Sequence, residues 1–292
     1  MPPQFLVIGH AVQDLSPGED VGERATWRLG GTVSYAALLA SRLGLRTAVL
    51  TAAAPDLPLE EALPGVDVVL APSDCSTQIR NVYGPHGRVQ YIVQQAAPIE
   101  AAMLPRDFRN AEIVLLGPVT GRVDTGLGEC FPKALIGVSA QGWLRDIGPD
   151  NRVRPVPPER WQADRLLKPG RVLFVSDEDL PKAHVEAVLN GWSARVEVLA
   201  FTRAERGAEV CHRGVWRRIE AFPAAAVDPT GAGDVFAAAF LIRYSESGDP
   251  WEATRFAACA ASFIVESEGL ANTPDRAMVE ERLRRHPEIV AR

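Results

Sequence analysis

The sequence has 292 residues, of which 47% are hydrophobic, and a formal net charge of −6 at pH 7. This length and apolar content are enough to bury a large core, and we expect one α/β domain over residues 1–292. The acidic balance and the scattered arginines exclude the basic surface typical of nucleic-acid binders.

The sequence also carries few signs of a membrane or metal protein. No apolar run approaches the length of a membrane span, and the N-terminus lacks the pattern of a signal peptide. The four cysteines and five histidines show no metal-ligand spacing, so we expect no structural zinc site. We therefore expect a cytoplasmic protein, monomer or homodimer, whose partner is a small molecule.

Short apolar runs alternate with helix-length segments along the first two thirds of the chain. The predicted strands, in chain order, are Phe5 to Ile8, Ala48 to Thr51, Val66 to Leu70, Ile113 to Leu116, Leu135 to Ser139, Val172 to Val175 and Val196 to Phe201. Predicted helices at Val33 to Leu43 and Lys182 to Trp192 lie between some of them. This alternation favours a central, mostly parallel sheet flanked by helices.

Three other segments break the pattern. Residues 77–94 contain two strand-like runs around a Gly-Pro turn, which predicts a hairpin; with the segment of about residues 12–30 it would form a small β lid. The stretch Arg145 to Pro158 is rich in Pro, Arg and Asp, and we expect it to form a long loop. From Val235 onward the chain is predicted to be mainly helical, with buried helices.

The most informative string is Asp228-Pro229-Thr230-Gly231-Ala232-Gly233-Asp234, a glycine-rich turn that leads into an apolar helix. Its glycines let the backbone approach an anion, and the first free N–H groups of the helix point at it. The anion is predicted to be a transferring phosphoryl group, held by Gly231, Ala232 and Gly233, with Asp234 as the base that takes a hydroxyl proton. The alternative is that the two aspartates merely cap the helix.

The whole string resembles the second signature of the ribokinase (PfkB) family of carbohydrate kinases, and the resemblance covers nearly the whole chain. It implies a ribokinase-like α/β fold and a kinase that uses ATP and Mg²⁺. It implies further roles for residues at matching positions. These are substrate binding by Asp14, Gly30 and Gly31, nucleotide binding by Ser176, Thr202, Gly207, Gly233 and Ala258, magnesium binding through water by Asp179 and Glu178, and a monovalent cation site, such as one for K⁺, at Asp228, Thr230, Ser267 and Gly269.

Departures from the family pattern cluster where the sugar would lie. Tyr35 replaces an Asn after the Gly-Gly pair, and Gly117-Pro118 stands where a Glu is expected, so ribose is predicted to be a poor substrate. Ala204 and Ser176 also replace a Gly and an Asn on the nucleotide side.

Within the family the chain is most similar to the myo-inositol kinase branch. The similar segments are 30–35, 138–145, 176–178 and 227–230, and they add Tyr35, Gln141 and Arg145 to the candidate substrate residues.

Other functions fit less well. The first strand is not followed by GxGxxG, and no Gly-Lys-Ser/Thr occurs, which disfavours a Rossmann oxidoreductase and a P-loop kinase. Two alternatives remain: a catalytically inactive sugar- or nucleotide-binding regulatory protein with the same fold, or a kinase for a nucleoside or another sugar.

Overall fold

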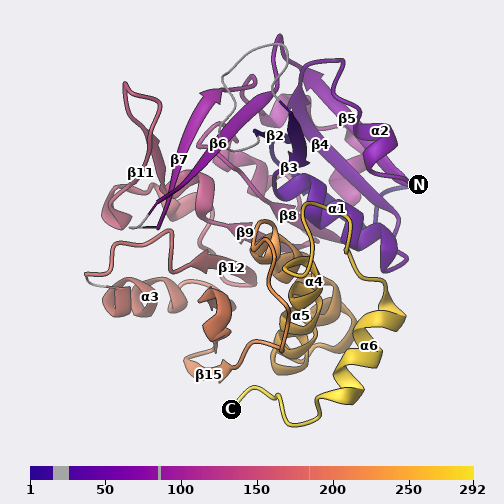
Figure 1. The fold of residues 1–292 in the computed structure, drawn as a ribbon, viewed down its shortest axis with the longest axis vertical. Coiled ribbons are helices and arrows are strands. Elements are labelled where there is room, and N and C mark those ends of the chain that lie inside the picture. The colour runs from indigo at the N-terminus through magenta and orange to yellow at the C-terminus, as the bar shows by residue number, and fades with distance from the viewer. Residues whose placement is uncertain (16–25, 85–86, 184) are drawn as a thin grey trace.

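The computed structural model describes residues 1–15, 26–84, 87–183 and 185–292 (Figure 1). Residues 16–25 and 85–86, which belong to the two predicted lid segments, lie outside the described residues. In the described ranges, no helix has the length and apolar content needed to cross a membrane.

A nine-stranded sheet forms the centre of the molecule, in the order β15-β14-β13-β12-β9-β8-β1-β4-β5. Its strands are β1 (Phe5–Ile8), β4 (Thr47–Ala53), β5 (Val66–Pro72), β8 (Ile113–Leu116), β9 (Leu135–Ser139), β12 (Arg171–Ser176), β13 (Val198–Thr202), β14 (Ala208–His212) and β15 (Val215–Ile219). Every neighbouring pair in this order from β13 to β5 is parallel, whereas β14 pairs antiparallel with both β13 and β15. The predicted, mostly parallel sheet is therefore confirmed.

Two apolar cores cover the faces of this sheet. In β1 the side chains alternate: Phe5 and Val7 belong to the core under α1, α4 and α5, and Leu6 and Ile8 belong to the core on the other face, with α3. The helices are α1 (Thr32–Arg42), α2 (Leu59–Ala62), α3 (Val185–Ser193), α4 (Ala232–Ser247), α5 (Pro250–Ile264) and α6 (Arg276–Arg285). The sequence predicted α1, α3 and the buried helices α4 and α5.

A second, four-stranded sheet has the order β3-β2-β6-β7. Its strands are β2 (Val12–Leu15), β3 (Trp27–Gly30), β6 (Thr77–Gly84) and β7 (Gly87–Gln94), and β2 pairs parallel with β6. Val12, Ile79 and Ile92 are buried from one face of this sheet against Val119, which follows β8. This small apolar cluster fixes the sheet over the ends of the central strands.

The stretch predicted as a long loop contains a short antiparallel hairpin, so that prediction was wrong. Its strands are β10 (Arg145–Ile147) and β11 (Val153–Pro155). Ile147 and Val153 pack onto the cluster around Val119, and the Asn151 carbonyl accepts a 2.9 Å hydrogen bond from the Ile92 N–H. The hairpin is stable because it gains these contacts with the second sheet, which local composition does not reveal.

Candidate active site

Two helices begin at glycines that provide no side-chain cap. Helix α4 follows Gly231, whose φ is 82°, and α1 follows Gly31, whose φ is 86°. An uncapped helix start leaves its first N–H groups available to a ligand, with the positive end of the helix dipole behind them. The glycine-rich turn therefore has the backbone expected of an anion-binding site.

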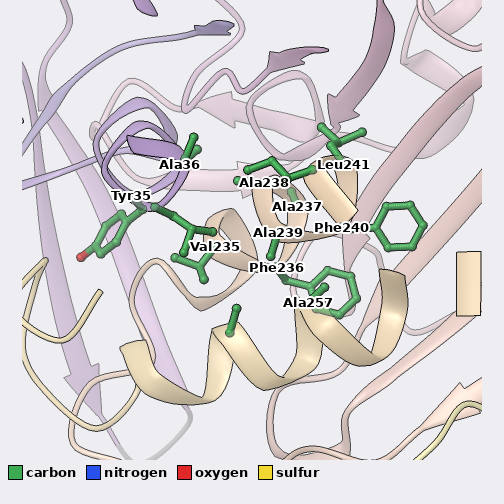
Figure 2. Packing of buried hydrophobic residues seen from close by; sticks show 14 of the residues in the cluster. Tyr35, Ala36, Val235, Phe236, Ala237, Ala238, Ala239, Phe240, Leu241 and Ala257 are labelled. Atoms are coloured by element: carbon green, nitrogen blue, oxygen red, sulfur yellow. The ribbon is translucent and has the colours of Figure 1, made fainter. Parts of the chain in front are cut away.

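Tyr35, in the first turns of α1, packs against Gly231 at the start of α4. A Cβ atom placed on Gly231 would lie 2.3 Å from the Tyr35 ring, so only glycine fits at this left-handed position. The Tyr35 side chain, 2% exposed, belongs to the α1–α4 core drawn in Figure 2. Burial raises the pKa of its phenol, as do the negative charges of Asp14, Asp234 and Asp228. Three carboxylates, from β2 and the motif, thus act electrostatically on one buried phenol.

Asp234 lies in the first turn of α4, and its side chain is half-buried. Burial raises the pKa of its carboxyl from 3.8 to about 6. The Thr32 hydroxyl, which donates a hydrogen bond, and the Arg145 guanidinium lower this pKa, and the Asp179 carboxylate raises it. The carboxyl is therefore ionised at neutral pH, yet it is more basic than an ordinary aspartate.

Thr32 is a neighbour of Asp234 that the sequence did not single out. It is 1% exposed, and a Cβ atom on Gly117 would lie 2.2 Å from its Cγ2 and 2.7 Å from its Cβ. No side chain fits at position 117 unless Thr32 moves. The glycine that replaces the expected Glu after β8 is thus explained by packing, and this departure was the one signal that could have indicated Thr32.

The candidate acceptor residues lie on the second sheet and the turn after β9. Gly30 has no room for a side chain, because a Cβ atom there would lie 2.0 Å from Oδ2 of Asp14. At Gly31 a Cβ atom would lie 2.5 Å from the His10 carbonyl oxygen. Gln141 begins a 3-10 turn that runs to Leu144, and Arg145 follows, donating a 3.3 Å hydrogen bond to the Val119 carbonyl.

Two of the candidate nucleotide residues lie at the ends of β12 and β13, and the others lie elsewhere in the fold. Ser176 and Thr202 are direct partners in this parallel pair. Gly207, with φ 81°, has no room for a side chain, since a Cβ atom would lie 2.0 Å from the Ile219 carbonyl oxygen. Ala204 also has a positive φ, 47°, so the chain keeps the left-handed backbone even where it lacks the family's glycine. Ala258 is buried in α5.

The two candidate magnesium residues differ in their surroundings. Asp179 is buried, and its Oδ2 accepts a 3.0 Å hydrogen bond from the Ser176 N–H. Glu178 is exposed. Across the part of the chain that the structure describes, no three His, Cys, Asp or Glu side chains gather as a metal site. Asp179 is thus placed near Asp234, and Glu178 lies at the surface.

The candidate monovalent-cation residues flank the end of α5. Asp228 Oδ1 accepts a 2.9 Å hydrogen bond from the Thr230 N–H, and the Val265 carbonyl accepts the N–H groups of Val227 and Asp228. The hydroxyl of Ser267 is buried and has no hydrogen-bond partner among the described residues. Gly269 follows with φ 61°. This turn therefore holds one buried oxygen that the described part of the chain does not satisfy.

Comparison with known proteins gives a family match for part of the chain. Residues 173–277 match the model of the pfkB family carbohydrate kinases, and this segment runs from β12 into α6. This segment is therefore similar to the pfkB family of carbohydrate kinases. The matched segment contains the glycine-rich turn and Asp234, whereas Asp14, Thr32 and Gly117 lie outside it.

Two archaeal kinases are similar to the chain over most of its length. The chain is 29% identical to a nucleoside kinase of Methanothermobacter thermautotrophicus over 261 residues, which is 84% of this chain and 81% of that protein. It is 28% identical to a cytidine kinase of Thermococcus kodakarensis over 272 residues, 85% of this chain and 90% of that protein.

Solved structures establish the ribokinase-like fold. A pyrophosphate-dependent kinase of the ribokinase family, solved with sulfate, superimposes with a TM-score of 0.78 at 23% identity, over 95% of this chain and 99% of that one. The complex of such a kinase with a pyrophosphate analogue and myo-inositol gives 0.76 at 22% identity, with 95% and 99% covered. Ribokinase of Arabidopsis thaliana, complexed with ribose and ATP, gives 0.71 at 22% identity, with 97% and 99% covered.

Proposed function

We propose that this protein transfers the γ-phosphoryl group of ATP to a hydroxyl of a small polyol or nucleoside. The observation that carries the proposal is the position of Asp234 in the first turn of an uncapped helix, with its pKa raised to about 6. Such a carboxylate is ionised at neutral pH and is a better proton acceptor than an ordinary aspartate.

In the proposed reaction, the acceptor oxygen attacks the γ-phosphorus as Asp234 accepts the hydroxyl proton, and the bond to the ADP oxygen breaks. The N–H groups at Gly231, Ala232 and Gly233 would bind the phosphoryl oxygens. Arg145, which lies within electrostatic reach of Asp234, would offset the charge that gathers between the carboxylate and the phosphoryl group.

Magnesium, when bound, would neutralise charge on the β- and γ-phosphates. We propose that Asp179 and Glu178 hold it through water. Their carboxylates suit Mg²⁺, which usually takes one or two protein carboxylates together with phosphate and water. Excess chelator should abolish turnover, and full activity in chelator would contradict the assignment.

A monovalent cation such as K⁺ is proposed at the turn that contains Asp228, Thr230, Ser267 and Gly269. The support is the buried Ser267 hydroxyl, which has no partner within the described structure and lies on the segment that hydrogen bonds to Asp228 through Val265. Rates measured in K⁺ should exceed those in a bulky organic cation. Equal rates would leave Asp228 with a purely structural role in the turn.

The second sheet is proposed to act as the lid of a single domain spanning residues 1–292. The register places Asp14 of β2 beside Ile79 of β6. The face of the second sheet that carries these two residues also carries Asn81, two residues after Ile79. Asn81 accepts a 2.8 Å hydrogen bond from the Gln90 side chain across β6 and β7. Carboxylate and amide groups on one face suit an acceptor with several hydroxyl or ring nitrogen groups.

Two acceptor classes follow from these observations. Tyr35 and Gly117 replace the residues associated with ribose and favour a ring polyol such as myo-inositol. The nucleoside and cytidine kinase relatives, which align over most of the chain, favour a nucleoside. The test is ADP release with ATP, in parallel with phosphate release from pyrophosphate, across inositols, nucleosides, pentoses and hexoses.

We expect one inositol or nucleoside to give the highest kcat/KM, and ribose a low one. The non-enzymatic alternative predicts another result: no turnover with any pair of donor and acceptor, but a thermal shift on adding sugar or nucleotide. If ribose proves to be the best acceptor, the interpretation of Tyr35 and Gly117 is wrong.

A further inference from the structure

Thr32 is the first residue of α1, yet it has no part in the reaction described so far. It comes directly after the Gly30-Gly31 pair and is 1% exposed. Its hydroxyl donates a hydrogen bond to the Asp234 carboxylate, which belongs to a helix 200 residues further along the chain. A buried hydroxyl on one helix thus meets the proposed base on another.

The surroundings of Thr32 fix its orientation. Its methyl carbon Cγ2 is the atom nearest to the Cβ position of Gly117, at 2.2 Å, whereas its Oγ1 is 3.2 Å from the same point. The methyl therefore packs against the glycine backbone after β8 while the hydroxyl is directed elsewhere. A β-branched residue has few χ1 rotamers, so this packing restricts the direction of the hydroxyl.

We propose that Thr32 is a positioning residue, whose hydroxyl holds one oxygen of the Asp234 carboxylate so that the other oxygen faces the acceptor hydroxyl. Gly117 is part of the same device, because it provides the space in which the Thr32 methyl lies. No proton passes to or from Thr32; it donates a hydrogen bond throughout, and the acceptor proton moves to the free oxygen of Asp234. The inference rests on the proposed role of Asp234 as base.

The charges around Asp234 determine what loss of this hydroxyl would do. Arg145, which begins β10, favours the ionised carboxylate, and Asp179, which follows β12, disfavours it. Burial is the largest influence, and it too disfavours the charge. Without the Thr32 hydroxyl, Arg145 alone among the described residues would oppose burial and Asp179, so the pKa of Asp234 would rise further.

The test compares Thr32→Val with Thr32→Ser. Valine keeps the methyl packing and removes the hydroxyl, whereas serine keeps the hydroxyl and removes the methyl. For Thr32→Val we expect the acid limb of the kcat profile to move up by about one pH unit, with a loss of roughly fivefold in kcat at pH 6. Thr32→Ser should keep the wild-type acid limb despite a lower thermal midpoint.

Thr254→Val is the matched control. Thr254 is also 1% exposed, and its hydroxyl donates a 2.6 Å hydrogen bond to the Pro250 carbonyl within α5. Its loss should lower the thermal midpoint and leave the pH profile unchanged. Gly117→Ala is a second variant: it keeps the hydroxyl but displaces Thr32, and should move the acid limb in the same direction as Thr32→Val.

The outcomes separate this inference from the proposed function. A wild-type pH profile in both Thr32→Val and Gly117→Ala would overturn the positioning role, even if Asp234→Asn is inactive. If Asp234→Asn retains wild-type kcat, the base itself is wrong, whatever the Thr32 variants do. If Thr32→Val does not fold, a wild-type profile in Gly117→Ala still overturns the inference.

Discussion

Helices α4 and α5 are neighbours in the chain and in space, but they begin in opposite ways. Asp249 caps α5 and accepts hydrogen bonds from the Trp251 and Glu252 N–H groups, at 2.8 and 3.4 Å. Gly231 precedes α4 and caps nothing. Asp275 likewise caps α6, accepting from the Met278 N–H at 2.9 Å. A side-chain cap stabilises a helix start but occupies the N–H groups, so an uncapped start next to the family motif favours ligand binding over stability.

The same two helices carry an acid at the same position, the third residue. In α5 this residue is Glu252, which is exposed and paired with Arg243. In α4 it is Asp234, whose pKa is raised by burial. One position in a helix thus supports a surface ion pair in one case and a candidate base in the other, and the surroundings decide between them.

The largest effect should come from removing the charge of that buried acid. Asp234→Asn keeps the size and hydrogen bonding of the side chain but cannot take a proton. General-base assistance is worth roughly 10²–10⁴-fold, so we expect kcat to fall by that factor, which is about 3–5 kcal/mol of barrier. The measurement is kcat on the best acceptor from the substrate panel.

Glu252→Gln is the matched control for Asp234→Asn, because it makes the same chemical change at the same helix position. Its kcat should equal that of the wild type, and its stability should change by less than about 1 kcal/mol, since exposed ion pairs contribute little. Near wild-type kcat in Asp234→Asn would contradict the base assignment and leave Asp234 as an ordinary helix-start acid.

The second prediction concerns a side chain added at Gly231, the residue before α4. In Gly231→Ala the new methyl would meet the Tyr35 ring in a left-handed backbone, φ 82°. We expect about 3 kcal/mol of lost stability, from roughly 1–2 kcal/mol of backbone strain together with the clash. The kcat/KM for the phosphoryl donor should fall more than tenfold, because the N–H groups shift. Gly248→Ala, at the left-handed end of α4 with nothing within 4 Å, should show the strain without the kinetic loss.

A third prediction concerns pH. The folded-state pKa of Asp234 is about 6, above its usual 3.8, so the folded protein binds this proton more tightly than the unfolded chain does. The stabilisation is complete below about pH 4 and is lost as the pH rises through 6. Asp234→Asn should therefore gain stability over the wild type, from nearly none at pH 4 to on the order of 2 kcal/mol at pH 7. Denaturant titrations of both proteins at these two pH values measure it, and a constant difference would show that Asp234 has an ordinary pKa.

The pKa of Asp234 also sets the pH dependence of the rate. A base must be ionised, so kcat should fall about tenfold per pH unit below pH 6 in the wild type. An acid limb near pH 4 would mean that Asp234 is not desolvated when substrates are bound.

The sequence predicted the elements whose pattern is continuous and missed those that depend on distant contacts. The parallel strands of the central sheet are short apolar runs, and periodicity was enough to find them. The antiparallel strands β14 and β15 were missed, because β15 contains two consecutive arginines, Arg217 and Arg218, and because the turn Arg213-Gly214 lacks an obvious signal although both residues have positive φ. The hairpin of β10 and β11 was assigned to a loop because its partner, β7, lies about 60 residues away.

The candidate site divides in the same way. The motif around Asp234 was visible because its residues are contiguous, whereas the electrostatic influence of Arg145 and Asp179 on Asp234 appears only in the structure. Thr32 was not identified, because its meaning depends on two residues, Gly117 and Asp234, that are remote in sequence. The raised pKa of Asp234 was not predictable either, since it comes from burial.

The smallest expected effect comes from removing the Asp249 cap at the start of α5. Asp249→Ala removes the side-chain oxygen that accepts from Trp251 and Glu252, and we expect about 1 kcal/mol of lost stability, the usual cost of losing an N-cap. The acid limb of the rate profile and kcat should not change, because this helix start binds no substrate in the proposed mechanism. Asp249→Asn, which keeps a capping oxygen, should restore most of the stability. Differential scanning calorimetry and kcat on the same samples measure both quantities. A loss of activity in Asp249→Ala without a matching loss of stability would mean that the capped and uncapped starts do not divide structural from catalytic roles, and that α5 positions the site as well.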